Sequence, residues 1–99
     1  MSKYILTKKA ITDLSDIWNY TYDNWSENQA DKYYSMILET CEQLATNPGI
    51  GKTYDNILDD LKGFRTGKHV IFYKNEDLDT ILIIRILHGQ MDFKNRIND

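Results

Sequence analysis

Apolar residues recur every three or four positions in two long segments of the first half of the chain. Thr7 is a good N-cap residue, and the stripe that follows it predicts a helix from residue 8 to about residue 24. The letters SENQ form a capping box from Ser26 to Gln29, followed by an amphipathic stripe that runs to Ala45. The NPGIG stretch ends this second helix, because the residue before a proline avoids the helical region. With so short a link between them, the two helices should form an antiparallel hairpin.

Strand-like runs lie on both sides of this hairpin. The letters KYIL before Thr7 predict a short strand, and GFRTGKHVIFYKN predicts two strands around Thr66–Lys68. The run DTILIIRILHG predicts a third strand, apolar on both faces and therefore central and covered on both sides. Residues 52–62 are expected to form a loop with one turn of helix, and residues 91–97 a terminal helical turn. The fold class is α+β with two layers, an N-terminal short strand and helical hairpin packed on a C-terminal antiparallel β-sheet.

The composition indicates a single domain over residues 1–99. The apolar fraction of 41% suits one core, and no run approaches the roughly 18 apolar residues of a membrane-spanning helix. The first residues lack the apolar stretch of a signal peptide. Cys41 is the only cysteine, which excludes a disulfide within the chain and favours a reducing compartment. We therefore expect a cytoplasmic protein with no membrane partner.

Charge argues against nucleic acid as the main partner. The net charge is −3, whereas proteins that bind phosphate backbones usually present a basic face. Basic residues are concentrated in the segment FRTGKH, residues 64–69. Acidic residues are expected at the surface as well: the aspartates of the first helix, Asp13 among them, fall mostly off its apolar stripe and should lie on a solvated face. No direct, sequence-specific binding of nucleic acid is expected.

Three motifs, taken together, resemble a known family. They are LT..A..DL..IW.YT...W near the start, LA.NP..G after the second helix and R.LH..MD near the end. In this order and spacing they resemble the ParE toxins of bacterial toxin–antitoxin modules, part of the larger RelE/ParE group, over residues 4–92. The resemblance implies a strand, hairpin and sheet fold without a cofactor. It also implies a toxin that inhibits DNA gyrase or topoisomerase IV by protein–protein contact and is held inactive by a cognate antitoxin in a hetero-oligomer.

Candidate binding residues lie in the C-terminal strands and on the hairpin. Arg85 interrupts an apolar run that ends at His88, and an uncovered apolar sheet face around it would mark a partner site. By motif match and strand adjacency, the expected target-binding residues are Arg65, Lys68, His69, Arg85, His88, Met91 and Asp92. Aromatic residues dominate many interfaces, although those of a hairpin are also natural core residues. The residues named for antitoxin contact are Trp18, Trp25 and Tyr34.

Two alternatives to gyrase inhibition stay open. In a ribosome-dependent messenger RNA endoribonuclease of the RelE kind, Arg85 would clamp a phosphate and His88 would move a proton. In a structural role, Arg85 would pair with a carboxylate such as Asp92, and His88 would cap a strand end. RelE-type enzymes generally carry a Tyr or His close to the C-terminus, and the ending FKNRIND has no Tyr. A non-toxic module that only binds an antitoxin is the other alternative.

Metal and thiol chemistry find little support in the sequence. His69, His88 and Asp92 together lack the ligand spacing of a zinc site. Cys41 lies on the apolar stripe of the second helix and reads as a small core residue rather than a nucleophile. We expect neither a metal nor a catalytic cysteine.

Overall fold

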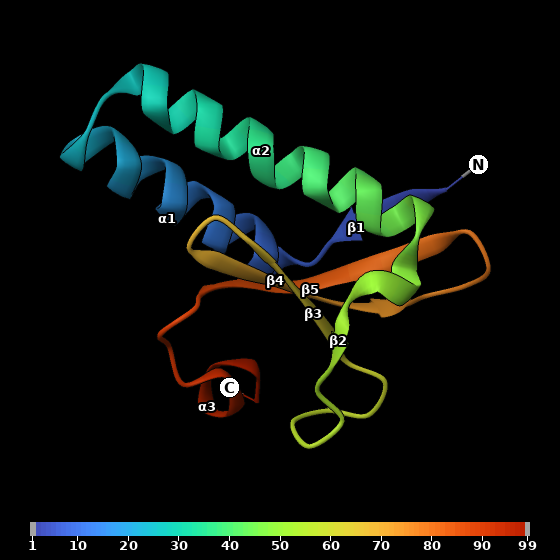
Figure 1. Cartoon of the computed structure of the whole chain (residues 1–99). Coiled ribbons are helices and arrows are strands. Elements are labelled where there is room, and N and C mark those ends of the chain that lie inside the picture. Colours follow the sequence, from blue (N-terminus) through green and yellow to red (C-terminus); the bar gives the residue numbers. More distant parts are fainter. Residues whose placement is uncertain (1, 99) are drawn as a thin grey trace.

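Two long helices form an antiparallel hairpin in the structure, a computed structural model that describes residues 2–98 (Figure 1). Helix α1 spans Lys8–Asn24, and the side chain of Thr7 accepts a hydrogen bond from the amide of Ala10. Helix α2 spans Glu27–Thr46, and Ser26 accepts from the amide of Gln29. Both predicted N-caps are therefore confirmed. None of the helices that residues 2–98 form is long and apolar enough to cross a membrane.

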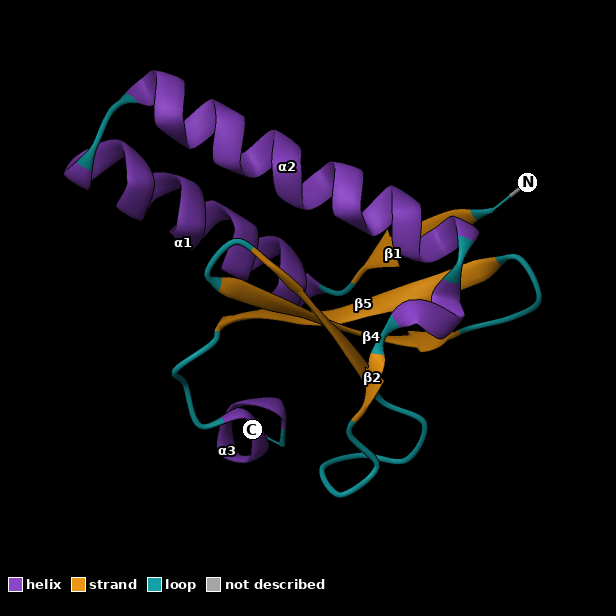
Figure 2. Cartoon of the chain, viewed as in Figure 1, coloured by secondary structure: helices purple, strands orange, loops and turns teal. Residues whose placement is uncertain are grey.

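Five strands form one sheet in the order β1-β5-β4-β3-β2 (Figure 2). The remaining elements are β1 (Lys3–Leu6), the 3-10 turn η1 (Pro48–Ile50), β2 (Lys52–Thr53), β3 (Lys62–Thr66), β4 (His69–Asn75), β5 (Thr80–His88) and α3 (Phe93–Ile97). The antiparallel meander of β3, β4 and β5 is confirmed. Strand β1 pairs with β5 in parallel, with Lys3 opposite Thr80. Local pattern predicts that β1 exists, but not where it pairs.

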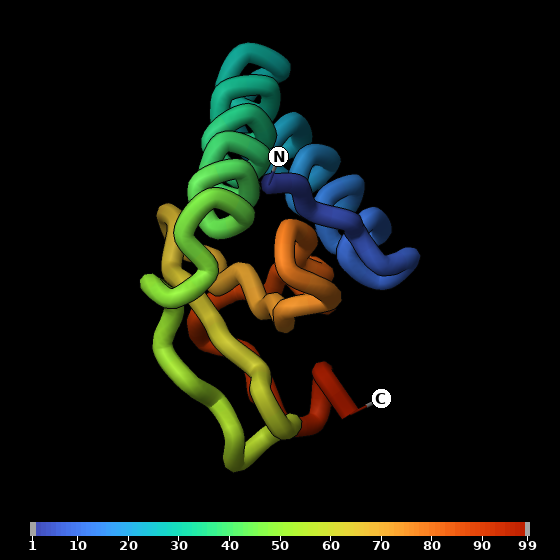
Figure 3. Tube along the Cα trace, turned by 90° about the vertical axis from the view of Figure 1, so that its right-hand side faces the viewer, coloured from blue at the N-terminus to red at the C-terminus, as the bar shows by residue number. Residues whose placement is uncertain are grey.

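The hairpin covers one face of the sheet and forms the main core with it (Figure 3). Its buried members are Ala10, Leu14, Ile17, Ile37, Cys41, Leu44, Ala45, Ile71, Tyr73, Ile81, Ile83 and Ile86. Most of the helical members lie on the two stripes seen in the sequence. Burying apolar surface at roughly 25 cal/mol per Å² makes this layer the main source of stability.

The other face of the sheet is also covered. Leu61, Val70, Phe72 and Leu87 form a second buried cluster there, joined by Tyr54, Ile57, Leu58, Ile84, Phe93 and Ile97. The covering residues come from the 54–61 segment and from α3, which lies on the side of the sheet away from the hairpin (Figure 1). The prediction that β5 is central and covered on both sides is therefore confirmed, whereas the alternative of an uncovered apolar face around Arg85 is wrong. The 54–61 segment supplies cover that its ambiguous pattern did not predict.

A β-bulge in β5 changes which of its residues face each of the two cores. Ile83 pairs with Tyr73 and Arg85 pairs with Phe72, so Ile84 is the extra residue of the bulge. Ile83 and Ile86 point into the hairpin core, while Ile84 joins the second cluster. The bulge shifts the normal alternation of side chains by one residue, so that Ile86 and not Arg85 joins Ile83 in the hairpin core.

Candidate functional site

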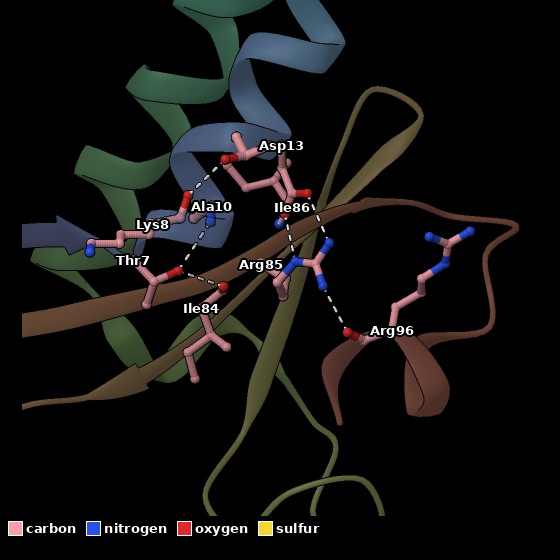
Figure 4. Close-up of polar contacts among 9 residues, drawn as sticks. Thr7, Lys8, Ala10, Asp13, Ile84, Arg85, Ile86 and Arg96 are labelled. Atoms are coloured by element: carbon pink, nitrogen blue, oxygen red, sulfur yellow. Dashed lines mark hydrogen bonds and ion pairs between the residues drawn. The ribbon is translucent and has the colours of Figure 1, made fainter. Parts of the chain in front are cut away.

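Helix α1 runs along the edge of β5 where β1 stops. The amide of Thr7 donates to the carbonyl of Ile83 at 3.1 Å, and Thr7 Oγ1 donates to the carbonyl of Ile84 at 2.8 Å. Further along the helix, Asp13 Oδ2 accepts from the amide of Ile86 at 3.0 Å (Figure 4). Side chains of α1 thus take over part of the hydrogen bonding that a neighbouring strand would provide.

Arg85 is held inside the protein by the same aspartate. Its Nε donates to Asp13 Oδ2 at 2.8 Å and its Nη2 to Asp13 Oδ1 at 2.9 Å, while Nη1 donates to the carbonyl of Arg96 at 2.7 Å (Figure 4). The side chains of Arg85 and Asp13 are only 14% and 11% exposed. Asp13 therefore does not lie on a solvated face, contrary to the sequence pattern. Asp92 instead caps α3 by accepting from the amide of Asn95.

Two histidines face each other at the end of the sheet. His69 and His88 are paired across β4 and β5, with ring centroids 5.4 Å apart and ring planes at 77°. The hydroxyl of Tyr33, from α2, lies 2.7 Å from His69 Nδ1 and accepts from the amide of Lys68 at 2.9 Å. Gly67 completes the turn between β3 and β4 with a φ of +58°. A Cβ there would lie 2.7 Å from the Tyr33 oxygen. The glycine therefore permits both the turn and the close approach of Tyr33.

Burial favours the uncharged forms of His69 and Tyr33. Burial, and next the neighbouring imidazole of His88, lower the pKa of His69 to about 4, with Asp13 acting weakly in the opposite direction. Burial also raises the pKa of Tyr33, although its hydrogen bond from Lys68 and the charge of Arg65 oppose that rise. His69 is thus a neutral imidazole at pH 7.

Two adjoining cavities, of about 430 and 450 Å³, open above these histidines and share Thr21 and His69. We call them together the histidine groove. Its lining residues are Asp16, Ile17, Tyr20, Thr21, Trp25, Gln29, Tyr33, Gly67, Lys68, His69, His88 and Met91. Three of them are exposed apolar side chains, with Trp25 at 74%, Tyr20 at 67% and Met91 at 40%. The groove therefore combines an apolar wall with a polar floor.

The groove brings together five of the residues named from the sequence. They are Trp25, Lys68, His69, His88 and Met91. The other five lie apart from its lining. Arg65 is exposed and donates to the carbonyl of Gly67, and Arg85 and Asp92 have the partners given above. Trp18 stacks on Tyr22 and donates to Asp31, and Tyr34 packs against the hairpin core.

Tyr20 and Tyr33 line the groove, but neither was among the binding residues named from the sequence. Tyr20 lies off the apolar stripe of α1, and a large aromatic residue outside such a stripe is a signal that was available. Tyr33 lies on the stripe of α2, so its apolar ring predicted a core position. Nothing in the local pattern predicts that its hydroxyl reaches His69.

The structure also shows how the metal-ligating residue types are distributed and where Cys41 lies. Within residues 2–98, no three or more His, Cys, Asp and Glu side chains are grouped so that they could hold a metal ion. Cys41 is buried in the hairpin core, as its place on the stripe predicts. Burial raises the pKa of its thiol to about 12, which keeps it protonated.

Comparison with known proteins gives one consistent family. The family described as ParE toxin of type II toxin-antitoxin system, parDE, matches residues 4–93. Toxin ParE1 of Mycobacterium tuberculosis is 35% identical over 91 residues, which cover 92% of this chain and 93% of that protein.

Two solved structures share the fold. A chain of the chromosomal ParDE system from P. aeruginosa is similar with a TM-score of 0.73 and 20% identity, over 89% of this chain and 95% of that one. A chain of the toxin–antitoxin complex RelBE2 from Mycobacterium tuberculosis follows with a TM-score of 0.67 and 19% identity, over 88% and 96%. The fold is thus common to ParDE and RelBE toxin–antitoxin systems, whereas the sequence matches distinguish between them. The chain belongs to the family of ParE toxins of type II toxin–antitoxin systems.

Proposed function

We propose that this protein is a toxin that inhibits DNA gyrase, or its relative topoisomerase IV, by protein–protein contact in the cytoplasm. In this proposal a cognate antitoxin neutralises it in a toxin–antitoxin hetero-oligomer; the two similar solved chains come from a ParDE toxin–antitoxin system and from the toxin–antitoxin complex RelBE2. No cofactor or chemical step is required of the toxin. Family membership supports the toxin role, and the choice of target is the part that needs testing.

The observation that carries the proposal is the composition of the histidine groove. It joins exposed aromatic and thioether side chains to the cation of Lys68 and to two imidazoles. Protein interfaces are enriched in such anchors, surrounded by polar groups that set specificity. Residues named separately for the target and for the antitoxin, such as His88 and Trp25, line this one groove. An antitoxin segment lying there would cover the target-binding groups, so that neutralisation works by competition.

The test is the supercoiling of relaxed plasmid by purified gyrase, with the toxin freed from its antitoxin and titrated in. Wild type should inhibit, and the double variant Lys68→Ala/His88→Ala should need at least about tenfold more protein, because losing central contacts typically costs an interface that much. Lys94→Ala is the matched control, since this exposed cation belongs to α3, which lies on the side of the sheet away from the hairpin. Arg85 stays unchanged in these variants because of its role within the fold.

Three outcomes decide the proposal. Inhibition by wild type and Lys94→Ala, but not by the double variant, supports gyrase as target and the groove as contact site. Inhibition of topoisomerase IV decatenation alone supports the relative instead. If neither enzyme is affected while the antitoxin still binds, the non-toxic module is the correct interpretation.

An endoribonuclease of the RelE kind is the second candidate, favoured by the hydrogen bond between Tyr33 and His69 beside Lys68. A neutral imidazole can accept a proton and a nearby ammonium group can bind a phosphate. The version in which Arg85 clamps the phosphate is disfavoured, because its guanidinium group is bonded to Asp13. Cleavage of messenger RNA on translating ribosomes, abolished by His69→Gln, would support this candidate.

A further inference from the structure

The Nδ1 atoms of both groove histidines face donors. Gln90 donates its backbone amide to His88 Nδ1 at 3.2 Å, and a backbone amide can only donate, so this Nδ1 carries no proton. Tyr33 Oη accepts from the amide of Lys68, and its own proton is available to donate to His69 Nδ1, 2.7 Å away. This assignment satisfies every member of the chain of hydrogen bonds from Lys68 to His69.

With this assignment, each neutral imidazole carries its proton on Nε2. Neither Nε2 atom has a hydrogen-bond partner among residues 2–98, and no buried side-chain nitrogen or oxygen in that range lacks one, so solvent reaches both atoms. His69 and His88 both line the groove. The low pKa of His69 agrees with a neutral ring at pH 7. The groove floor thus offers two N–H donors whose other ring nitrogens are already occupied.

The surroundings of these donors are selective. Ile17, Tyr20 and Met91 make the cavity over the two rings mostly apolar, and Lys68 lines the adjoining cavity. Asp16 also lines the wall, but its side chain is exposed and its charge is screened by solvent. Two N–H donors and an ammonium group suit an anionic acceptor, and a carboxylate is the one that protein segments carry.

We propose that the histidine groove binds a protein segment that carries one carboxylate between apolar side chains. The carboxylate accepts from the Nε2–H groups of His69 and His88, whose ring centroids are close enough, at 5.4 Å, for one carboxylate to reach both. Its apolar neighbours pack against Tyr20, Trp25 and Met91. The proposal rests on the proposed function only in taking the occupant to be a protein partner.

The first measurement is the tautomer of each histidine, from long-range ¹H–¹⁵N correlation spectra of the labelled protein at pH 7. The second is a titration of the same sample with phenylacetate and, as its uncharged match, phenylacetamide. Both rings should be Nε2–H tautomers. Phenylacetate should shift both Nε2 signals in a saturable way and bind about tenfold more tightly than phenylacetamide, since a hydrogen bond to a charged group is worth about that factor.

Two variants distinguish a loss of the carboxylate site from a general loss of folding. His88→Leu should remove the preference for phenylacetate over phenylacetamide, while Lys94→Ala should retain it. Nδ1–H tautomers, equal affinity for the two probes, or an unchanged preference in His88→Leu would each overturn the proposal. These readouts require neither gyrase nor antitoxin, so a failure here leaves the gyrase test to be judged on its own, and a failed gyrase test leaves the carboxylate site to be judged by the probes.

Discussion

Asp13 and Arg85, 72 positions apart in the sequence, form a two-point ion pair in which Asp13 Oδ2 also accepts from the backbone of β5. One carboxylate thus neutralises a mostly buried guanidinium group and satisfies the amide of Ile86. The pair joins α1 to β5 and leaves the guanidinium Nη1 to bind the carbonyl of Arg96, which attaches α3 as well. Arg85 therefore connects three elements of the fold.

Replacing Asp13 by Ala should destabilise the protein by about 3 kcal/mol, because a mostly buried cation and a backbone amide both lose their acceptor. Urea unfolding followed by circular dichroism measures the change. Asp16→Ala, an exposed aspartate on the same helix, is the control and should stay within about 0.5 kcal/mol of wild type. Equal stability of the two variants would show that the ion pair contributes little.

The free energy of unfolding should decrease as the pH is lowered, because of the titration of His69. Its pKa is lowered in the folded protein to about 4, below the ordinary value of 6.5, so the unfolded chain takes up a proton first. The stabilisation is complete above pH 6.5 and is lost as the pH falls towards 4. Carboxylates titrate in part of this range, so the quantity to measure is the difference between wild type and His69→Gln. A difference that does not change between pH 7 and pH 4 would contradict the assignment.

Gly67→Ala should destabilise the turn between β3 and β4 by about 1–2 kcal/mol, because a φ of +58° strains any residue with a Cβ and the added carbon meets Tyr33. Thermal unfolding detects this loss. Gly49→Ala is the matched control, since a Cβ there meets nothing within 4 Å. Similar melting temperatures for the two variants would argue against a strained turn.

Tyr33→Phe should release the tautomer of His69 while leaving that of His88 unchanged. The substitution removes the hydroxyl that bonds to His69 Nδ1, whereas His88 keeps its bond from Gln90. Imidazole ¹⁵N shifts should show a tautomer mixture for His69 only. Tyr22→Phe, at a half-exposed ring outside the groove, should change neither histidine. A single Nε2–H tautomer of His69 in Tyr33→Phe would mean that another group holds it.

Trp25→Ala should weaken antitoxin binding by at least about tenfold without a comparable loss of stability, because the ring is 74% exposed in the free toxin and is an anchor of the groove. Calorimetric titration with the antitoxin measures the affinity. Leu78→Ala offers a control at a fully exposed apolar residue in the turn between β4 and β5, at the other end of the sheet. If both variants bind like wild type, the antitoxin does not use Trp25.

Sequence patterns correctly predicted the structural features that depend on residues close together in the chain. The caps at Thr7 and Ser26 depend on residues within one helical turn, and the hairpin follows from two stripes and a short link. The pairing of Arg85 depends on Asp13, in another part of the chain. Since Asp13 lies off the stripe of α1, its sequence context predicted a solvated position. Spacing within α1 carries no information about the edge of β5 that lies beside it.

Some residues of the candidate site could likewise be predicted from the sequence, and others could not. His69 and His88 were named together because adjacent antiparallel strands bring their ends together, and the register pairs them directly. Tyr33 was not, because a tyrosine on a helical stripe serves a core equally well with or without a bonded hydroxyl. The direction of a side chain and the tautomer of a ring depend on contacts between distant segments, which only the folded structure contains.

The contacts of Thr7 and Asp13 with β5 also protect an exposed strand edge against pairing with a second copy of the protein. Past Ile83, β5 has no neighbouring strand on the β1 side, and free carbonyl and amide groups on such an edge are a template for pairing with a second chain. The bonds to the carbonyl of Ile84 and the amide of Ile86 occupy that template. A toxin whose β5 edge is closed by its own helix meets other proteins through side chains in this region, and not by adding a strand there.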